Sequence, residues 1–515
     1  MTDRDPLDLP LFSSVVPPRD SLPVSDLPAG RRPGRVRSTW KYPGAAERPD
    51  SPVRLVRAEE LPPGLQPRVS VDWSLVAGFR SQVAERLTRS IAGGLDSQAQ
   101  QELGRAVILE VLDEAAAEAV RAGDKPWTSA EQDALAAAVF DAVFRLGRLQ
   151  PLVDDPNVEN IIITGADRVW LERVDGSLVR GPAVADSDAE LVEFIAFLAS
   201  RSGQGTTARP FSEASPSLDL RLPDGSRLAA TNWLTATPSI VIRRHRLVHV
   251  TLEELVGLGT LTPILGSFLA AAVRARWSIV VAGAQGSGKT TLMRGLCAEI
   301  DPDEQLATFE DPYELFLHEM PERHHVVHAW EARHGSGEIG VDGRPAGEYT
   351  TERQLRDSFR YNASRQIVGE IRGPEVWAMV KAMESGSGSL STTHSASAGA
   401  AMAKLVTCAM EAGPHVSREL ATSKLGEAID LVVQMHTQID RRPDGTQRKR
   451  RWVSEIVFVC PGEAEHGYAL THVFTPTSDG PARASVLPDE LRDLAAHGFD
   501  LGGFLTEAAQ RRGPR

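Results

Sequence analysis

The sequence predicts an α/β protein in which a mostly parallel sheet, with helices on both faces, follows a smaller α/β domain and a helical unit. The first observation is an apolar run, "SIVVAG", which leads through a glycine-rich turn into "TLMRGLCAEI" and is typical of a strand, a turn and a helix. The second is that strand and helix signals alternate from about residue 250 onward. The third is a set of β-branched and aromatic runs, separated by polar turns, between residues 151 and 245.

The length of 515 residues exceeds what one hydrophobic core usually serves, so we expect several folded parts. Residues 1–70 carry 13 of the 34 prolines and little apolar periodicity, which predicts a disordered leader. The predicted parts that follow are a helical unit over 71–150, an α/β domain over 151–248, the domain with the glycine-rich turn over 249–475, and a weakly patterned tail over 476–515.

The helical unit is predicted from apolar residues at helical spacing. The clearest stripe is Leu103, Val107, Ile108, Val111 and Leu112. A second helix, "AEQDALAAAVFDAVFRL", is preceded by Ser129 and carries Gln132 three residues later, a pair that resembles a capping box.

Composition and charge exclude several classes of protein. The longest apolar run near the glycine-rich turn is interrupted by Arg274 and Arg276, so no membrane-spanning helix is expected, and the acidic, proline-containing start is unlike a signal peptide. Cys297, Cys408 and Cys460 are far apart and odd in number, which argues against a disulfide framework or a clustered metal site. A net charge of −13 makes nucleic acid an unlikely partner. We therefore expect a cytoplasmic protein.

The strongest motif is "GAQGSGKT", which satisfies G-x-x-x-x-G-K-[ST] completely. Its glycines allow backbone N–H groups to turn toward phosphate oxygens, and the following helix adds the positive end of its dipole. Lys289 can reach the β- and γ-phosphates, and the Thr290 hydroxyl can bind Mg²⁺. The predicted nucleotide-binding residues are Gly283, Ala284, Gln285, Gly286, Ser287, Gly288, Lys289, Thr290 and Thr291.

Hydrolysis also needs a group that positions water and groups that neutralise developing charge. "LATFEDPYEL" presents Glu310 at the end of an apolar run, about where the neighbouring strand of such a sheet would stop. "RQIVGEIRG" contains a short strand, Ile367 and Val368, that delivers Glu370 to the same edge, and "GSLSTTHSAS" places His394 in a hydroxyl-rich run that can lie beside the γ-phosphate. The order of these stretches predicts an NTP hydrolase.

Together these stretches resemble the secretion ATPases of the type II/type IV superfamily. The similarity rests on the phosphate loop, the acidic box "FED", the Walker B stretch "IVGEIRG" and the histidine box "GSLSTTH". Upstream, "LDLRLPDGSRLAATN" and "SIVIRRH" look like the N-terminal domain of the CpaF-like branch, which serves Tad/Flp pili. The resemblance implies a smaller N-terminal sensor domain joined to a RecA-like P-loop ATPase domain.

The resemblance also implies roles for individual residues. Glu310 matches the acidic-box carboxylate, which with Thr290 would hold Mg²⁺; Glu370 matches the Walker B glutamate that orients water, and His394 the histidine-box sensor. In this family arginines from the N-terminal domain reach the nucleotide. Their best matches here are Arg221 and Arg227 in "LRLPDGSR", with Arg243 in the "IRR" linker.

The function implied by the resemblance is a hexameric ATPase motor, with ATP and Mg²⁺ as cofactors. It would lie at the inner face of the cell membrane and power pilus assembly or secretion through an inner-membrane platform protein. Two alternatives stay open. Basic stretches such as "RRPDGTQRKRR" favour a conjugation-type DNA-transfer ATPase. The "SGSGS" run, where the family commonly has "TGHDGS", favours a nucleotide-gated scaffold that does not hydrolyse ATP.

Overall fold

The computed structural model describes residues 71–90, 96–201, 211–244, 247, 249–333, 335, 339–341, 343, 345–384, 386, 388–462 and 467–512. The predicted leader lies outside the described residues. The chain forms two compact units. The first comprises the described residues up to Arg244, except the turn segments Val174–Ser177 and Pro223–Gly225; the second comprises those two segments and the chain from His245 onward.

The first unit begins with the predicted helices. They are α1 (Trp73–Ser90), α2 (Ser97–Ala122) and α3 (Ser129–Phe144), followed by the short α4 (Gln150–Asp154). Val83, Leu112 and Val139 meet in a small core between the three long helices. The capping box that starts α3 consists of Thr128 and Glu131, so the prediction of Ser129 and Gln132 is wrong by one residue. Thr and Ser are both favoured N-cap residues, and sequence alone does not separate adjacent candidates.

An antiparallel sheet completes the first unit, with strand order β3-β2-β1-β6-β5-β4. Its strands are β1 (Val158–Thr164), β2 (Val169–Arg173), β3 (Leu178–Arg180), β4 (Ser217–Arg221), β5 (Arg227–Thr231) and β6 (Ser239–Arg243). Helix α5 (Asp188–Arg201) packs on it through Leu191 and Ile195, which share a core with Ile161 and Leu228.

The second unit is built on a nine-stranded sheet, ordered β15-β14-β13-β12-β7-β11-β10-β8-β9. The parallel part contains β7 (Ile279–Gly283), β8 (Gln305–Glu310), β9 (Val326–Glu331), β10 (Arg365–Ile371), β11 (Leu390–His394) and β12 (Leu431–Arg441). The antiparallel part adds β13 (Gln447–Pro461), β14 (Tyr468–Thr475) and β15 (Arg483–Ala484). The predicted α/β fold is confirmed.

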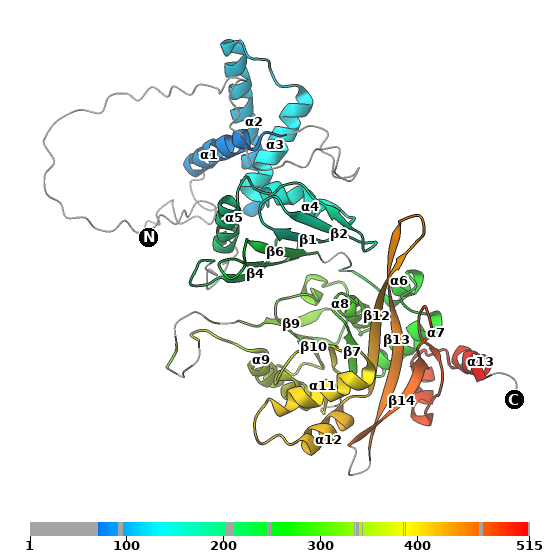
Figure 1. Ribbon diagram of the computed structural model, residues 1–515. Coiled ribbons are helices and arrows are strands. Elements are labelled where there is room, and N and C mark those ends of the chain that lie inside the picture. Colours follow the sequence, from blue (N-terminus) through cyan, green and yellow to red (C-terminus); the bar gives the residue numbers. More distant parts are fainter. Residues whose placement is uncertain are drawn as a thin grey trace. The chain divides into compact units, whose positions relative to one another are not determined.

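Helices cover both faces of this sheet (Figure 1). They are α6 (Leu252–Gly257), α7 (Pro263–Arg274), α8 (Lys289–Cys297), α9 (Thr351–Ser358), α10 (Glu375–Met383), α11 (Ala398–Met410), α12 (Arg418–Ala428) and α13 (Leu501–Arg512). Ile279 and Val281 of β7 enter a core with α7 and α8, whereas Val280 and Ala282 enter a second core with α10 and α11. This is why the strand reads as a continuous apolar run.

Two details differ from expectation. The strand that ends at Glu310, β8, is not next to β7, because β11 and β10 lie between them. Residues beyond 476 contribute Leu491, Phe499 and Phe504 to the core of the second unit. The division into domains at residues 150, 248 and 475 stays a prediction. Among the described residues, no helix has both the length and the hydropathy of a membrane-spanning segment.

Candidate functional site

A glycine-rich turn joins the carboxyl end of β7 to helix α8. Gly286 and Gly288 have φ angles of 71° and 91°, in the left-handed region that favours glycine. At Gly283 a Cβ atom would lie 2.6 Å from the Ser287 hydroxyl oxygen, so this position has no room for a side chain. Ser287 is buried, and its hydroxyl has no hydrogen-bond partner among the described residues. A compact backbone loop at a helix N-terminus is an arrangement that binds phosphate groups.

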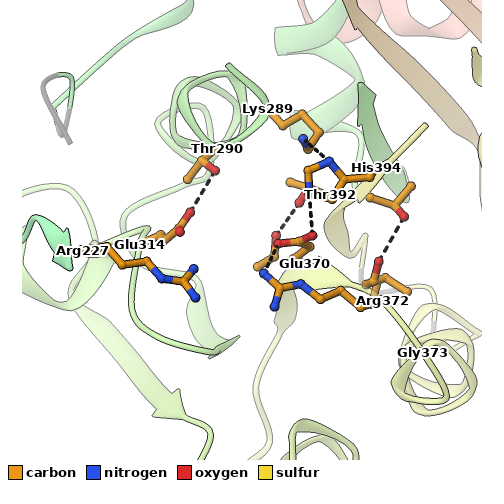
Figure 2. A network of polar contacts seen from close by, with 12 residues as sticks. Arg227, Lys289, Thr290, Glu314, Glu370, Arg372, Gly373, Thr392 and His394 are labelled. Atoms are coloured by element: carbon orange, nitrogen blue, oxygen red, sulfur yellow. Dashed lines mark hydrogen bonds and ion pairs between the residues drawn. The ribbon is translucent and has the colours of Figure 1, made fainter. Parts of the chain in front are cut away.

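Lys289, the first residue of α8, links this turn to the end of β11 (Figure 2). Its ammonium nitrogen lies 3.0 Å from the carbonyl oxygen of Ala284 and 3.1 Å from Nδ1 of His394. An ammonium group can only donate, so Nδ1 must accept, and the neutral ring carries its proton on Nε2. The other predicted loop residues, Gln285 and Thr291, occupy the turn and the first turn of α8.

Glu370, near the end of β10, contacts the second nitrogen of the His394 ring. Nε2 of His394 lies 2.9 Å from Oε1 of Glu370, and Arg372 donates to Oε2 at 2.7 Å. Burial alone would raise the pKa of Glu370, but the hydrogen bonds from His394 and Arg372 outweigh it and the pKa is lowered. Glu370 is therefore an ionised carboxylate at neutral pH. The structure brings together Lys289, His394 and Glu370 from three different elements.

The strand geometry that brings these residues together is irregular at one point. The pairing of β10 with β11 shifts between Val368 and Ile371, so that Gly369 and Glu370 lie opposite Thr392 alone. The hydroxyl of Thr392 donates to the carbonyl of Gly369 at 2.6 Å, and the hydroxyl of Thr393 donates to that of Ile371 at 3.0 Å. These bonds replace ladder hydrogen bonds and fix Glu370 beside His394.

Glu310 is buried under the loop that follows β8. Its Oε2 accepts hydrogen bonds from the backbone N–H groups of Glu314 and Leu315, both at 2.7 Å, and only 3% of the residue is exposed. Burial raises the pKa of Glu310 to about 7, although the two backbone bonds act in the opposite direction. Oε2 of Glu310 thus holds the backbone of the loop after β8.

The carboxylate beside Thr290 belongs to Glu314. The Thr290 hydroxyl donates to Oε2 of Glu314 at 3.1 Å. Arg294, one turn further along α8, donates through both Nε and a terminal nitrogen to the backbone carbonyl of Glu314, and it also donates to the Leu247 carbonyl at 2.7 Å. Helix α8, which follows the phosphate loop, therefore also holds the loop after β8 in place.

The predicted arginines lie in the first unit, in register across three strands. Arg221 of β4 pairs with Arg227 of β5, and Arg227 pairs in turn with Arg243 of β6. Arg227 also lies 3.7 Å from the Asp219 carboxylate. Three cations therefore cross one end of the sheet, and their action on a nucleotide stays a prediction.

The family model described as "Type II/IV secretion system protein" matches residues 145–457, more than half of the chain. The chain belongs to this family. The type IV secretion system protein VirB11 of Brucella suis is 29% identical over 341 residues, which cover 61% of this chain and 89% of that protein. A putative conjugal transfer protein of Mycobacterium tuberculosis is 28% identical over 361 residues, covering 68% and 94%.

Among solved structures, the VirB11 ATPase of the Brucella suis type IV secretion system, in complex with sulphate, has 27% identity and covers 62% of this chain and 96% of its own. Its TM-score is 0.30. The region that the family model matches covers parts of both units, because it starts at residue 145, within the first unit, and ends at residue 457, in β13 of the second.

Sequence reasoning missed three residues that the geometry of this family member singles out: Glu314, Arg294 and Arg372. Glu314 stands in the quoted stretch "LATFEDPYEL", four residues after Glu310, and its acidity was the available signal. Arg372 lies within the Walker B stretch "IVGEIRG", two residues after Glu370, whereas Arg294 gives no sequence signal because a basic residue is common on a helix.

Proposed function

We propose that this chain is a Mg-ATP hydrolase that works as a hexameric motor for pilus assembly or secretion. The observation that carries the proposal is the continuous set of contacts Lys289–His394–Glu370. It connects the residue suited to phosphate binding with the carboxylate suited to activating water.

Phosphate binding would use the turn between β7 and α8. The ammonium group of Lys289 donates to Ala284 and His394, and an incoming phosphate would take over these donations because it carries more negative charge than either acceptor. His394 would then lose the contact at Nδ1. The ring can thus report phosphate binding to Glu370, which it contacts through Nε2.

Glu370 would accept the proton of the attacking water. Glu370 is ionised and can therefore accept a proton, and a cavity of about 320 Å³ is lined in part by Glu370 and Arg372. The contacts from His394 and Arg372 orient the carboxylate. Part of that restraint would be released when phosphate draws Lys289 away from His394.

Magnesium fits two neighbouring residues, Thr290 in the first turn of α8 and Glu314 in the loop after β8. The hydroxyl of Thr290 and the carboxylate of Glu314 are adjacent oxygen donors, the chemistry that Mg²⁺ prefers. Among the described residues no three His, Cys, Asp or Glu side chains form a metal cluster, which suits an ion bound largely by phosphate and water. When bound, Mg²⁺ would neutralise charge on the phosphates. Glu310 remains a proposed ligand through its unpartnered Oε1.

Arg221 and Arg227 would complete the site from the N-terminal unit, in the same chain or a neighbouring one. Positive charge on the γ-phosphate stabilises the transition state, and supplying it from a separate unit makes hydrolysis depend on a movement. The motor would act in the cytoplasm, bound to an inner-membrane platform protein of a Tad/Flp-type pilus.

A conjugation-type motor for DNA transfer is the second candidate. It is favoured by the conjugal transfer protein among the relatives and by the cations Arg441, Arg442, Arg448, Lys449, Arg450 and Arg451 on the β12–β13 hairpin.

Steady-state phosphate release from the purified chain tests the proposal, with Lys289→Ala as the control. We expect Mg²⁺-dependent release that the control lacks. A chain that binds ATP and assembles without release would be a scaffold instead. Stimulation of release by DNA would favour the conjugation motor over the pilus motor.

A further inference from the structure

The β12–β13 hairpin extends beyond the sheet of the second unit, on the side of the phosphate loop (Figure 1). β12 pairs with β7 from Leu431 to Met435, where Met435 is opposite Gly283. From His436 to Arg441 the partner of β12 is β13. The hairpin therefore continues as a two-stranded ribbon over residues 436–452, starting at the strand end where the phosphate loop begins.

The base of this ribbon packs against the phosphate loop. Nε of Arg451, on β13, donates to the carbonyl oxygen of Gly286 at 2.9 Å. A Cβ atom at Gly288 would lie 3.3 Å from Cδ of Arg451, and one at Gly283 would lie 2.9 Å from the carbonyl oxygen of Met435. Three glycines of the loop thus lie against Arg451 of the ribbon and against Met435, the residue directly before it.

The hydrogen bond from Arg451 orients a peptide group of the loop. In a trans peptide the carbonyl and the following N–H point in opposite directions. Because the Gly286 carbonyl is directed to Arg451, the N–H of Ser287 is directed to the inside of the turn. There the Ser287 nitrogen lies 3.3 Å from the carbonyl oxygen of Ala284. Inward N–H groups are what a phosphate loop offers to its anion.

We propose that Arg451 is a positioning residue of the phosphate loop, which ties nucleotide binding to the β12–β13 ribbon. Arg451 acts through the Gly286 carbonyl, and its permanent charge strengthens that bond. The inference rests on the proposed nucleotide site. Because coupling between two sites is reciprocal, bound nucleotide must also restrain the ribbon, and a partner that moves the ribbon must change nucleotide affinity.

ADP binding to the full-length chain, followed by calorimetry, tests the positioning role without requiring hydrolysis. We expect Arg451→Gln to bind ADP about tenfold more weakly, the size of one charge-assisted hydrogen bond. Arg451→Lys keeps the charge and should recover part of the loss. Arg448→Ala is the matched control, because it removes the same charge from an exposed position on the same strand and should bind like wild type.

Amide hydrogen exchange tests the reciprocal effect. Saturating ADP should slow exchange over residues 436–452 in the wild type and in Arg448→Ala, but not in Arg451→Gln. Melting without nucleotide should change little in any variant, since neither Arg448 nor Arg451 is among the buried residues.

Three results would overturn the proposal: wild-type affinity in Arg451→Gln, an equal loss in Arg448→Ala, or a loss of affinity that merely follows a lower melting temperature. The first result would mean that the bond from Arg451 to Gly286 does not affect nucleotide binding. The second would mean that only the net charge of the ribbon affects it. The third would mean that Arg451 contributes to stability and not to the position of the loop. Failure of the wild type itself to bind ADP would contradict the proposed function instead.

Discussion

Glu310 and Glu314 are four residues apart, but the structure gives them different environments. Glu310 is buried and accepts two backbone N–H groups, whereas Glu314 reaches the Thr290 hydroxyl. A buried donor that loses its acceptor costs about 1–3 kcal/mol. Glu310 therefore maintains the acidic loop, and Glu314 is the side chain that this loop presents to the phosphate site.

Replacing each glutamate with alanine should give distinct defects. Glu310→Ala should lower the melting temperature by several degrees, because the N–H groups of Glu314 and Leu315 lose their acceptor. Glu314→Ala should leave the melting temperature nearly unchanged and raise the Mg²⁺ concentration needed for half-maximal phosphate release several-fold. Glu322→Ala, at an exposed position nearby, is the control. A Mg²⁺ requirement altered only in Glu310→Ala would assign the metal to Glu310.

At the scale of elements, the site depends on how β10 and β11 are joined. The bulge at Gly369 and Glu370 interrupts the ladder, and Thr392 restores one link through its side chain. Thr392 is buried, so removing its hydroxyl leaves the Gly369 carbonyl without that partner. The distance from His394 to Glu370 depends on this alignment.

Thr392→Val keeps the shape of the side chain and removes the hydroxyl. We expect kcat for phosphate release to fall by about tenfold or more, since small misplacements of catalytic groups are costly, while ADP affinity changes little. Thr308→Val on β8 is a matched control, because Thr308 is also buried and its hydroxyl has no hydrogen-bond partner among the described residues. Equal kcat values for the two variants would show that the Thr392 bond does not align the site.

At the scale of the whole molecule, the candidate groups are divided between two units. Lys289, His394 and Glu370 belong to the second unit, whereas Arg221 and Arg227 lie on adjacent strands of the first. A motor needs chemistry that responds to domain movement, and this division provides it if the arginines reach the nucleotide.

Mixed assemblies test whether the arginines act between chains. Arg227→Ala alone should lower kcat by roughly 10³-fold while ATP affinity changes much less, as for an arginine finger. Mixing it with Lys289→Ala subunits should restore some activity if an intact phosphate loop meets an intact arginine across an interface. No recovery would indicate action within one chain. Unchanged turnover in both Arg221→Ala and Arg227→Ala would leave these residues as surface charges.

The sequence predicted the candidate site best where functional residues follow the ends of predicted strands. Lys289 follows the predicted strand in "SIVVAG", and Glu370 follows the predicted strand Ile367 and Val368, while the hydroxyl-rich run with His394 was expected beside the γ-phosphate. Their meeting could therefore be expected. The order of the strands could not be expected, because periodicity does not say which strands are neighbours in a sheet. The separation of β8 from β7 was missed for this reason. Glu314 was missed because its position depends on the loop after Glu310. Phe499 and Phe504 were missed as core residues because their segment lacks a regular apolar repeat.

The proposed function requires Lys289 to bind phosphate and Glu370 to activate water in one ATPase site. The most direct test measures ATP binding and phosphate release in parallel for Lys289→Ala and Glu370→Gln. We expect Lys289→Ala to lose tight binding. Glu370→Gln should bind ATP like wild type and lose turnover by at least about 10²-fold, because the amide cannot accept a proton. Phosphate release by Glu370→Gln at the wild-type rate would contradict this account.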